Sequence, residues 1–212
     1  MKKKIIATLL LTALVAPVLQ GCFPIVAAGV ATGVTVALDR RTLGAQTDDE
    51  TTEWKAKSQV GEKLGDKAHL NFTSFNGKVL ISGEVPSEEA KAEAERIVLG
   101  LPHVQHVFNE LIVGPTSSFS ARSNDSYITS KVKARTLDSS TKFNAAHLKV
   151  VTEAGTTFLL GIMTQTEADS AVQIVRTTSG VKKVVTLIEI VSLAKVQELD
   201  AKQKNDSEAQ KK

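Results

Sequence analysis

Residues 70–85 read LNFTSFNGKVLISGEV, and this stretch decides how the surrounding chain is expected to fold. Apolar residues alternate with other residues on both sides of Asn76-Gly77, as is typical of strands with a buried face. Asn-Gly suits the positive φ angles of a two-residue hairpin turn. The stretch therefore predicts two antiparallel strands. Gly83, near the end of the second strand, indicates a bulge or a close approach between backbones.

The same pattern occurs again further along the chain. Gly77 and Gly83 recur as Gly155 and Gly161, 78 residues later, and each hairpin is followed by a helical pattern and a further apolar strand. A constant offset with a shared order of elements is typical of internal duplication. The sequence therefore predicts two copies of one unit, joined by a linker that begins Gly-Pro-Thr-Ser-Ser at residue 114.

Each copy is expected to run helix, strand, strand, helix, strand, which defines an α+β fold. The last strand returns through a helix, so it can pair in parallel and complete a three-stranded mixed sheet packed on two helices. The first helix is expected from Thr51 to Leu64 in one copy, and from Tyr127 to Leu137 in the other, after capping residues at 123–126. Met163 is expected in a core, and Trp54 in a core or between the copies.

The strand sequences resemble a known family. Val-x-Ile-x-Gly-x-Val at 79–85, followed by a helix, and Ser-Gly-Val-Lys-Lys-Val at 179–184 resemble the BON domain. The resemblance implies BON domains over residues 47–113 and 124–191, a linker over 114–123, and a polar C-terminal tail over 192–212. We expect little order in that tail beyond a helical turn or two.

The N-terminus has the three-part plan of a secretory signal, with lysines at 2–4 and an apolar run over 5–18. It ends in Leu19-Gln20-Gly21-Cys22, which resembles the lipobox of bacterial lipoproteins and holds the one cysteine of the chain. The resemblance implies that residues 1–21 are removed and that Cys22 is acylated. An ordinary signal peptide with a stray thiol is the alternative reading.

The residues after the lipobox bear on location. In the lipoprotein pattern an Asp after the Cys retains the protein in the inner membrane, and here that residue is Phe23. This implies a lipid anchor in the outer membrane with the protein facing the periplasm. Residues 22–46 are expected to form the acylated N-terminus and a tether. Two BON domains behind a lipobox are together similar to the dual-BON outer-membrane lipoproteins.

No set of residues typical of catalysis or of a cofactor stands out in the sequence. Of the four histidines, His103 and His106 are close together, but they fall in a loop and a strand start without a Cys or His cluster beside them. The acidic residues at 88–95 fit a solvated helix face better than an acid–base pair. We therefore expect no enzyme, no metal site and no cofactor.

Charge separates the two copies. Removal of residues 1–21 takes three of the 26 basic residues and none of the 23 acidic ones, so the remaining chain has 23 of each. Residues 47–113 carry seven basic and twelve acidic residues, whereas residues 122–191 carry nine and six. Nucleic acid is not expected outside the cytoplasm, so the second copy is expected to bind the anionic phospholipids phosphatidylglycerol and cardiolipin.

The expected helix at 127–137 has more apolar residues than a core face needs. Ile128 and Val132 form a stripe for the core, and a second stripe from Tyr127 to Leu137 lies beside it. Basic residues next to that stripe can reach lipid phosphates. The family resemblance implies that this helix engages phospholipid. The contact residues expected from the pattern and the resemblance are Tyr127, Ile128, Lys131, Val132, Ala134, Arg135 and Leu137.

The alternative for this helix is that Tyr127 and Leu137 pack under the linker or the first domain. The prediction for the whole chain is a lipid-anchored outer-membrane protein that binds anionic phospholipid through its second BON domain and supports outer-membrane integrity. The resemblance also implies enrichment at division sites. The rival prediction is a periplasmic adaptor whose envelope protein partners serve outer-membrane assembly or cell-wall remodelling, with incidental lipid contact.

Overall fold

The computed structural model describes residues 39–138 and 140–209, with side chains placed as far as Lys204. The signal peptide, Cys22 and the tether up to residue 38 lie outside the described residues. In chain order the helices and strands are α3 (Leu43–Leu64), β1 (His69–Phe75), β2 (Lys78–Val85), α4 (Glu88–Leu99), β3 (His106–Val113), α5 (Phe119–Thr136), β4 (Leu148–Glu153), β5 (Thr156–Met163), α6 (Gln165–Arg176), β6 (Lys183–Ile190) and α7 (Leu193–Ala209). Short 3₁₀ turns at Gly65–Lys67 and Ala145–His147 precede β1 and β4.

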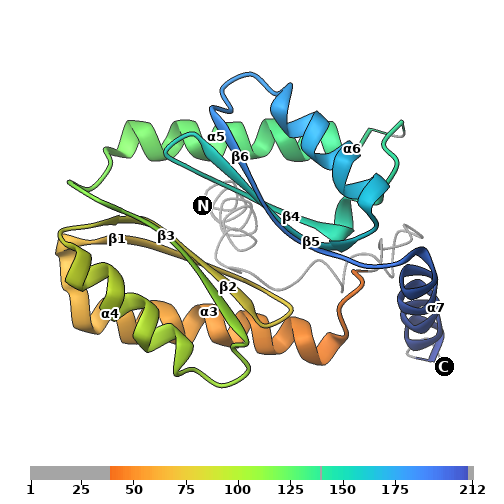
Figure 1. The fold of residues 1–212 in the computed structure, drawn as a ribbon, viewed down its shortest axis with the longest axis horizontal. Helices are drawn as coiled ribbons and strands as arrows, with labels where there is room; N and C mark the ends of the chain where they lie inside the picture. The colour runs from red at the N-terminus through yellow and green to blue at the C-terminus, as the bar shows by residue number, and fades with distance from the viewer. Residues whose placement is uncertain (1–38, 139, 210–212) are drawn as a thin grey trace, which may run out of the picture. The chain divides into compact units, whose positions relative to one another are not determined.

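Each copy of the repeat forms one three-stranded mixed sheet. In the first, β2 pairs antiparallel with β1 and parallel with β3, and β5 has the same relation to β4 and β6 in the second. The helices α3 and α4 lie on one face of the first sheet, and α5 and α6 on one face of the second (Figure 1). The predicted α+β fold with helix, strand, strand, helix, strand in each domain is confirmed.

An aspartate on the first helix of each domain holds the hairpin turn. The Asp49 carboxylate of α3 accepts hydrogen bonds from the backbone N–H groups of Asn76 at 2.7 Å and Gly77 at 3.0 Å. In the second domain Asp125 of α5 accepts the equivalent bonds from Ala154 and Gly155 at 3.0 and 2.9 Å. Both aspartates are buried. The contact fixes which face of the helix points toward the sheet.

The turns themselves have the predicted geometry. Asn76 and Gly77 have φ angles of 53° and 75°, and Ala154 and Gly155 have 50° and 78°. Gly83 serves a different purpose, because a Cβ there would lie 2.0 Å from the carbonyl oxygen of His69. Of the two sequence interpretations for this glycine, a close approach between neighbouring strands is the one that the structure shows.

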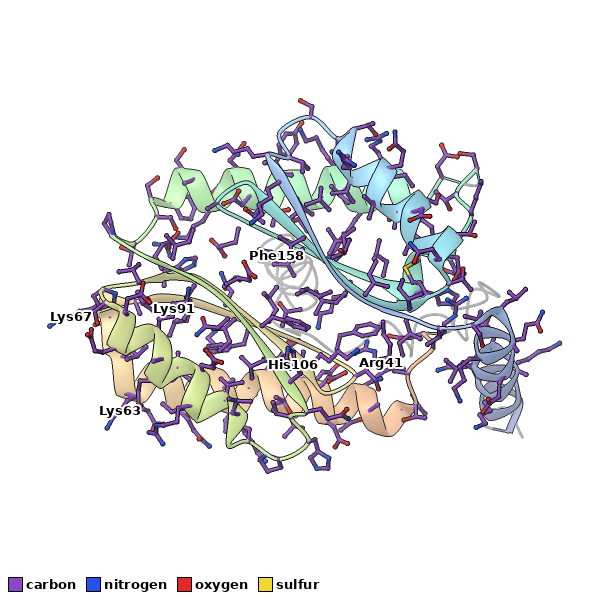
Figure 2. The ribbon with its side chains drawn as sticks, in the orientation of Figure 1. Arg41, Lys63, Lys67, Lys91, His106 and Phe158 are labelled. Carbon is purple, nitrogen blue, oxygen red and sulfur yellow. The ribbon has the colours of Figure 1, made fainter. Side chains whose placement is uncertain are left out.

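The two faces of each sheet are both buried. Val79 and Ile81 of β2 point toward the helices and pack with Ala56 and Val60 of α3. Leu80 lies between them in the sequence, so its side chain points to the opposite face. There it joins a third apolar cluster with residues of the second domain. The buried members of this interdomain cluster are Phe75, Leu80, Phe158, Leu160 and Ile162, and Figure 2 labels Phe158.

Polar contacts surround the interdomain cluster. Lys149 of β4 pairs with Glu53 of α3 at 2.6 Å, and Lys78 of β2 pairs with Glu189 of β6 at 2.9 Å. Arg41, labelled in Figure 2, lies with its guanidinium 4.1 Å from the centre of the Phe75 ring and pairs with Asp49 at 2.8 Å. The two domains therefore share an apolar contact edged by ion pairs.

Three of the sequence predictions for helix limits were wrong. The helix α3 begins at Leu43, where the Thr42 side chain caps it, and not near Thr51, so residues 43–46 are helical and not tether. The helix α5 begins at Phe119 with Ser118 as its cap, so the expected caps at 123–126 are inside the helix. The expected polar tail contains the helix α7.

The residues just before α3 and the C-terminal helix α7 are held by polar contacts, which an apolar sequence pattern does not predict. Arg40 binds both carboxylate oxygens of Glu167 at 2.8 and 2.9 Å and donates to Asp200 of α7 at 2.9 Å. Burial raises the pKa of Glu167, but the hydrogen bonds from Arg40 and Thr164 outweigh it and hold that pKa below its ordinary value. The apolar side chain of Val196 on α7 is buried. Ion pairs and hydrogen bonds thus order two segments whose polar sequence predicts little structure.

Two core predictions had different outcomes. Met163 is fully buried in the core of the second domain, as expected. Trp54 was predicted in a core or between the domains, and the structure leaves it 70% exposed. The buried residues of α3 are Asp49, Thr52, Ala56 and Val60. Position 54 is off this stripe, because residues two apart on a helix do not share a face.

We predict that removal of either turn-holding carboxylate is costly. Asp49→Ala leaves buried N–H groups and the Ser74 hydroxyl without their acceptor, so it should lower the free energy of unfolding by about 3 kcal/mol. Asp125→Ala should act in the same direction. The matched control is Asp48→Ala, a partly exposed neighbour whose loss should cost under about 0.5 kcal/mol. Urea denaturation measures all three, and equal stabilities for Asp49→Ala and Asp48→Ala would contradict the assignment.

Low pH should weaken the hydrogen bonds that the Asp49 carboxylate accepts. Burial opposes ionisation of Asp49, but hydrogen bonds from Ser74, Gly77, Arg41 and Asn76 outweigh it and lower its pKa below 3.8. A lowered pKa in the folded state means that the stabilisation is present above 3.8 and is lost as pH falls through the lowered value. Asp49→Asn should therefore lose stability at neutral pH and show a shallower decline below pH about 4 than the parent chain.

Candidate membrane interface

The inner face of α5 packs in the core of the second domain. Its buried residues are Asp125, Ile128, Val132 and Thr136. Ile128 is 2% exposed and Val132 is fully buried. The sequence assigned these two residues both to a core stripe and, through the family resemblance, to the lipid contact. The structure places them in the core, so they support the helix and do not reach a surface.

The outer face of α5 carries a line of exposed apolar side chains. Tyr127 is 62% exposed and Leu137 is 75% exposed, and Ala134 between them is exposed as well. Phe119, in the first turn, is 84% exposed and belongs to the same face, since it precedes Leu137 by 18 residues, a whole number of turns at 3.6 residues each. Serines fill the face between them. We call Phe119, Tyr127, Ala134 and Leu137 the outer stripe.

Phe119 was missed by the sequence analysis. The signal that could have found it is Ser118, a favourable N-cap residue directly before Phe119, whose side chain accepts the N–H of Ala121 at 3.2 Å. The four-residue polar run at 123–126 was read as the helix start in its place. The helix is therefore two turns longer at its N-terminus, and the outer stripe is longer with it.

Basic residues flank the outer stripe on both sides. Lys131 and Arg135 lie on the side toward α6: the Lys131 ammonium donates to the Ser179 carbonyl, and Arg135 donates to the Ile174 carbonyl at 2.7 Å. Lys133 is exposed on the other side, and Arg122 there donates to the Ser117 carbonyl at 2.8 Å. The acceptors in these three contacts are neutral carbonyl oxygens, so the hydrogen bonds orient the cations without cancelling their charge.

Asp125, the one acidic residue of α5, does not lie beside these cations. Its carboxylate is buried and directed at the hairpin turn, away from the outer stripe. Lys131 also lies over the Tyr127 ring, 4.8 Å from its centre, which brings a cation and an amphipathic aromatic together at one edge of the stripe. An apolar stripe between two rows of cations is the arrangement of a helix that lies in a membrane interface.

A second polar cluster lies where the domains meet. His69 of β1 pairs with Glu84 of β2 at 3.0 Å, and its Nδ1 atom lies 3.8 Å from Glu153 of β4. Burial raises the pKa of Glu153, and the negative charges of Glu84 and Asp125 add to the rise against the opposing effects of Asn71 and His69. No sequence pattern predicts this group, because its members are separated by up to 84 positions and come from both domains.

His103 and His106, the histidine pair noted in the sequence, contact different residues. His103 lies 3.4 Å from Asp48, and His106 contacts the Phe108 ring edge-on at 4.5 Å. Cys22, the predicted acylation site, lies outside the described residues. Among the helices in the described part of the chain, none is long and apolar enough to cross a membrane.

The class of protein follows from the fold and from the sequence profile of a family. The BON domain profile matches residues 48–115 and 124–192, well over half of the chain. The protein belongs to the BON domain family and has two such domains.

Similar proteins in other bacteria indicate which kind of BON domain protein this is. The chain is 41% identical over 173 residues to the outer membrane lipoprotein DolP of Haemophilus influenzae, covering 81% of this chain and 89% of the relative. It is also 33% identical over 159 residues to a 21 kDa hemolysin of Actinobacillus pleuropneumoniae, covering 74% and 81%. With its lipobox, this chain is an outer-membrane lipoprotein.

Solved structures add a distant likeness. CdsD, a structural protein of the type III secretion system of Chlamydia trachomatis, aligns with 69% of this chain and 96% of its own at 14% identity and a TM-score of 0.28.

The two faces of α5 should respond differently to truncation. Ile128→Ala removes a buried side chain and should lower the free energy of unfolding by about 3 kcal/mol. Leu137→Ala and Phe119→Ala remove exposed side chains and should change it by less than about 0.5 kcal/mol. Urea denaturation of the three variants measures the difference. A large loss for Leu137→Ala would mean that this residue packs against the protein, as the alternative reading held.

Proposed function

We propose that the protein is held on the periplasmic face of the outer membrane by acylated Cys22 and that the outer stripe of α5 docks onto anionic phospholipid. The observation that carries the proposal is the run of exposed apolar residues from Phe119 to Leu137 between two rows of cations. A monomeric domain gains no stability from such a face in water. It gains free energy once the apolar side chains enter the boundary between headgroups and acyl chains.

The strength of the contact can be judged from its parts. Each basic residue near an anionic surface contributes about 1 kcal/mol, so the four cations around the stripe give about 4 kcal/mol, and the apolar side chains add to this. Alone, 4 kcal/mol corresponds to a dissociation constant of about 1 mM. The acyl anchor makes docking intramolecular, so the effective lipid concentration is high and a contact of this strength is sufficient.

Docking would hold the first domain in a defined place on the membrane surface, because the two domains share the interdomain cluster. In this position on the inner leaflet, the protein would support outer-membrane integrity through its response to anionic lipid, including at division sites. No catalytic step is part of the proposal.

One observation favours an additional role as an adaptor. Trp54 on α3 is 70% exposed, on a domain whose charge is negative. Exposed tryptophans are enriched where proteins bind one another. The α3 surface around Trp54 is therefore the place where we expect an envelope protein partner, while α5 serves the membrane.

Charge reversal beside the stripe tests the lipid proposal. The mature chain with Cys22→Ala, which lacks the anchor, should float with vesicles that contain phosphatidylglycerol and not with vesicles of phosphatidylcholine alone. Lys131→Glu combined with Lys133→Glu should weaken binding at least tenfold, since it replaces two attractive charges with two repulsive ones. High salt should weaken the wild-type contact in the same direction.

The matched control is the same change on the corresponding helix of the first domain. Lys57→Glu with Lys63→Glu alters two exposed lysines of α3 and should leave flotation unchanged (Figure 2 labels Lys63). Far-UV circular dichroism confirms that each variant is folded. Equal loss in both double variants would show a response to net charge alone. Equal binding of the α5 variant and the parent chain would remove α5 as the site.

A further inference from the structure

His69, Glu84 and Glu153 meet at the junction of the two domains, and each offers a metal-binding atom. The atoms of this group, the junction triad, all lie within 4.8 Å of one another. His69 Nδ1 is 3.0 Å from a Glu84 oxygen and 3.8 Å from a Glu153 oxygen. We propose that the junction triad is a site for a divalent transition-metal ion, with Zn²⁺ as the preferred ion.

The spacing of the atoms suits an ion at their centre. Zinc binds imidazole nitrogen and carboxylate oxygen at about 2.1 Å, so two ligands of a tetrahedral site are about 3.4 Å apart. The separations of 3.0 and 3.8 Å lie on either side of that value. Every separation within the triad is at most 4.8 Å, so a small rotation of the side chains would place the three ligands around one ion. A fourth position remains for water.

The backbone holds the three ligands in place. His69 and Glu84 are direct partners in the β1–β2 ladder, so their side chains stand on the same face. Gly83 lets the two strands approach at this point, because its missing Cβ makes room for the His69 carbonyl. Glu153 ends β4 directly before the turn that Asp125 holds. Three regular strands, and no loop, therefore supply the ligands.

The buried carboxyl groups of the triad favour the binding of a cation. Glu84 and Glu153 are each 6% exposed and bring two carboxyl groups to the junction. Ser117 donates to Glu84 at 3.0 Å and Asn71 donates to Glu153 at 2.6 Å, but both donors are neutral. Burial of uncompensated charge is costly, and a divalent ion cancels it.

The donor set selects the type of ion. One imidazole nitrogen with two carboxylate oxygens suits zinc and related transition metals. Calcium takes six to eight oxygen ligands and magnesium keeps near-octahedral oxygen coordination, so the triad fits neither ion well. Because Glu153 comes from the second domain and the other two ligands from the first, the ion would join the domains and stabilise the folded chain.

Calorimetry on the full-length chain in detergent, stripped with EDTA and dialysed, tests the proposal. Titration with ZnCl₂ should show one site per chain that raises the melting temperature, and MgCl₂ or CaCl₂ should bind at least tenfold more weakly. Glu153→Gln keeps the size and the Asn71 contact but removes a charge, so it should weaken zinc binding at least tenfold. Glu84→Gln should do the same through an independent ligand.

Two controls separate the triad from other causes. Glu189→Gln removes the interdomain ion pair with Lys78 outside the triad and should keep the zinc affinity of the parent chain. His103→Ala with His106→Ala removes the surface histidines and should also keep it. All chains share Cys22, so its contribution cancels. Absence of zinc binding by the folded parent chain, or equal affinity in the Glu153→Gln, Glu84→Gln and parent chains, would overturn the proposal.

Discussion

The hydrogen bonds that the Asp49 and Asp125 carboxylates accept from the two hairpin turns are the constraint on which the rest of the structure depends. Each joins the first helix of a domain to the turn between its first two strands, about 30 residues away in the chain. Because a buried carboxylate must keep its donors, the helix cannot rotate about its axis without a large loss of free energy. In α5 this fixes Ile128 and Val132 inward and leaves the outer stripe free. The membrane interface is thus a consequence of how the helix is held.

The interdomain cluster gives the two domains a common position. The strands β2 and β5 are apolar on both faces, one against their own helices and the other against the partner domain. Arg40 and Arg41, which lie within the predicted tether, bind residues of both domains: Arg40 pairs with Glu167 and Arg41 with Asp49. The junction triad lies at this boundary too, where a bound ion would strengthen it.

Sequence alone predicted the elements that follow a repeating apolar pattern. The hairpins, the duplication and the crossover to a parallel third strand come from alternation and from Asn76-Gly77, and the family model agrees. The start of α3 was predicted wrongly because polar contacts order this part of the chain. Arg40 pairs with Glu167 and Arg41 with Asp49, and these pairs stabilise a segment without an apolar stripe. The run FLLGIM at 158–163 did carry a signal for burial on both faces, since it does not alternate. The junction triad has no local pattern, because only the tertiary fold brings its members together.

The orientation of α5 on a bilayer tests the account most directly. Spin-labelled phosphatidylglycerol in vesicles broadens the NMR signals of groups near the headgroups and acyl chains, and the mature Cys22→Ala chain can be followed residue by residue. If the outer stripe docks onto lipid, broadening is strongest at Phe119, Tyr127 and Leu137 and weak at Ile128 and along α3. Broadening centred on α3, or none on α5 when the protein is bound to the vesicles, would contradict it.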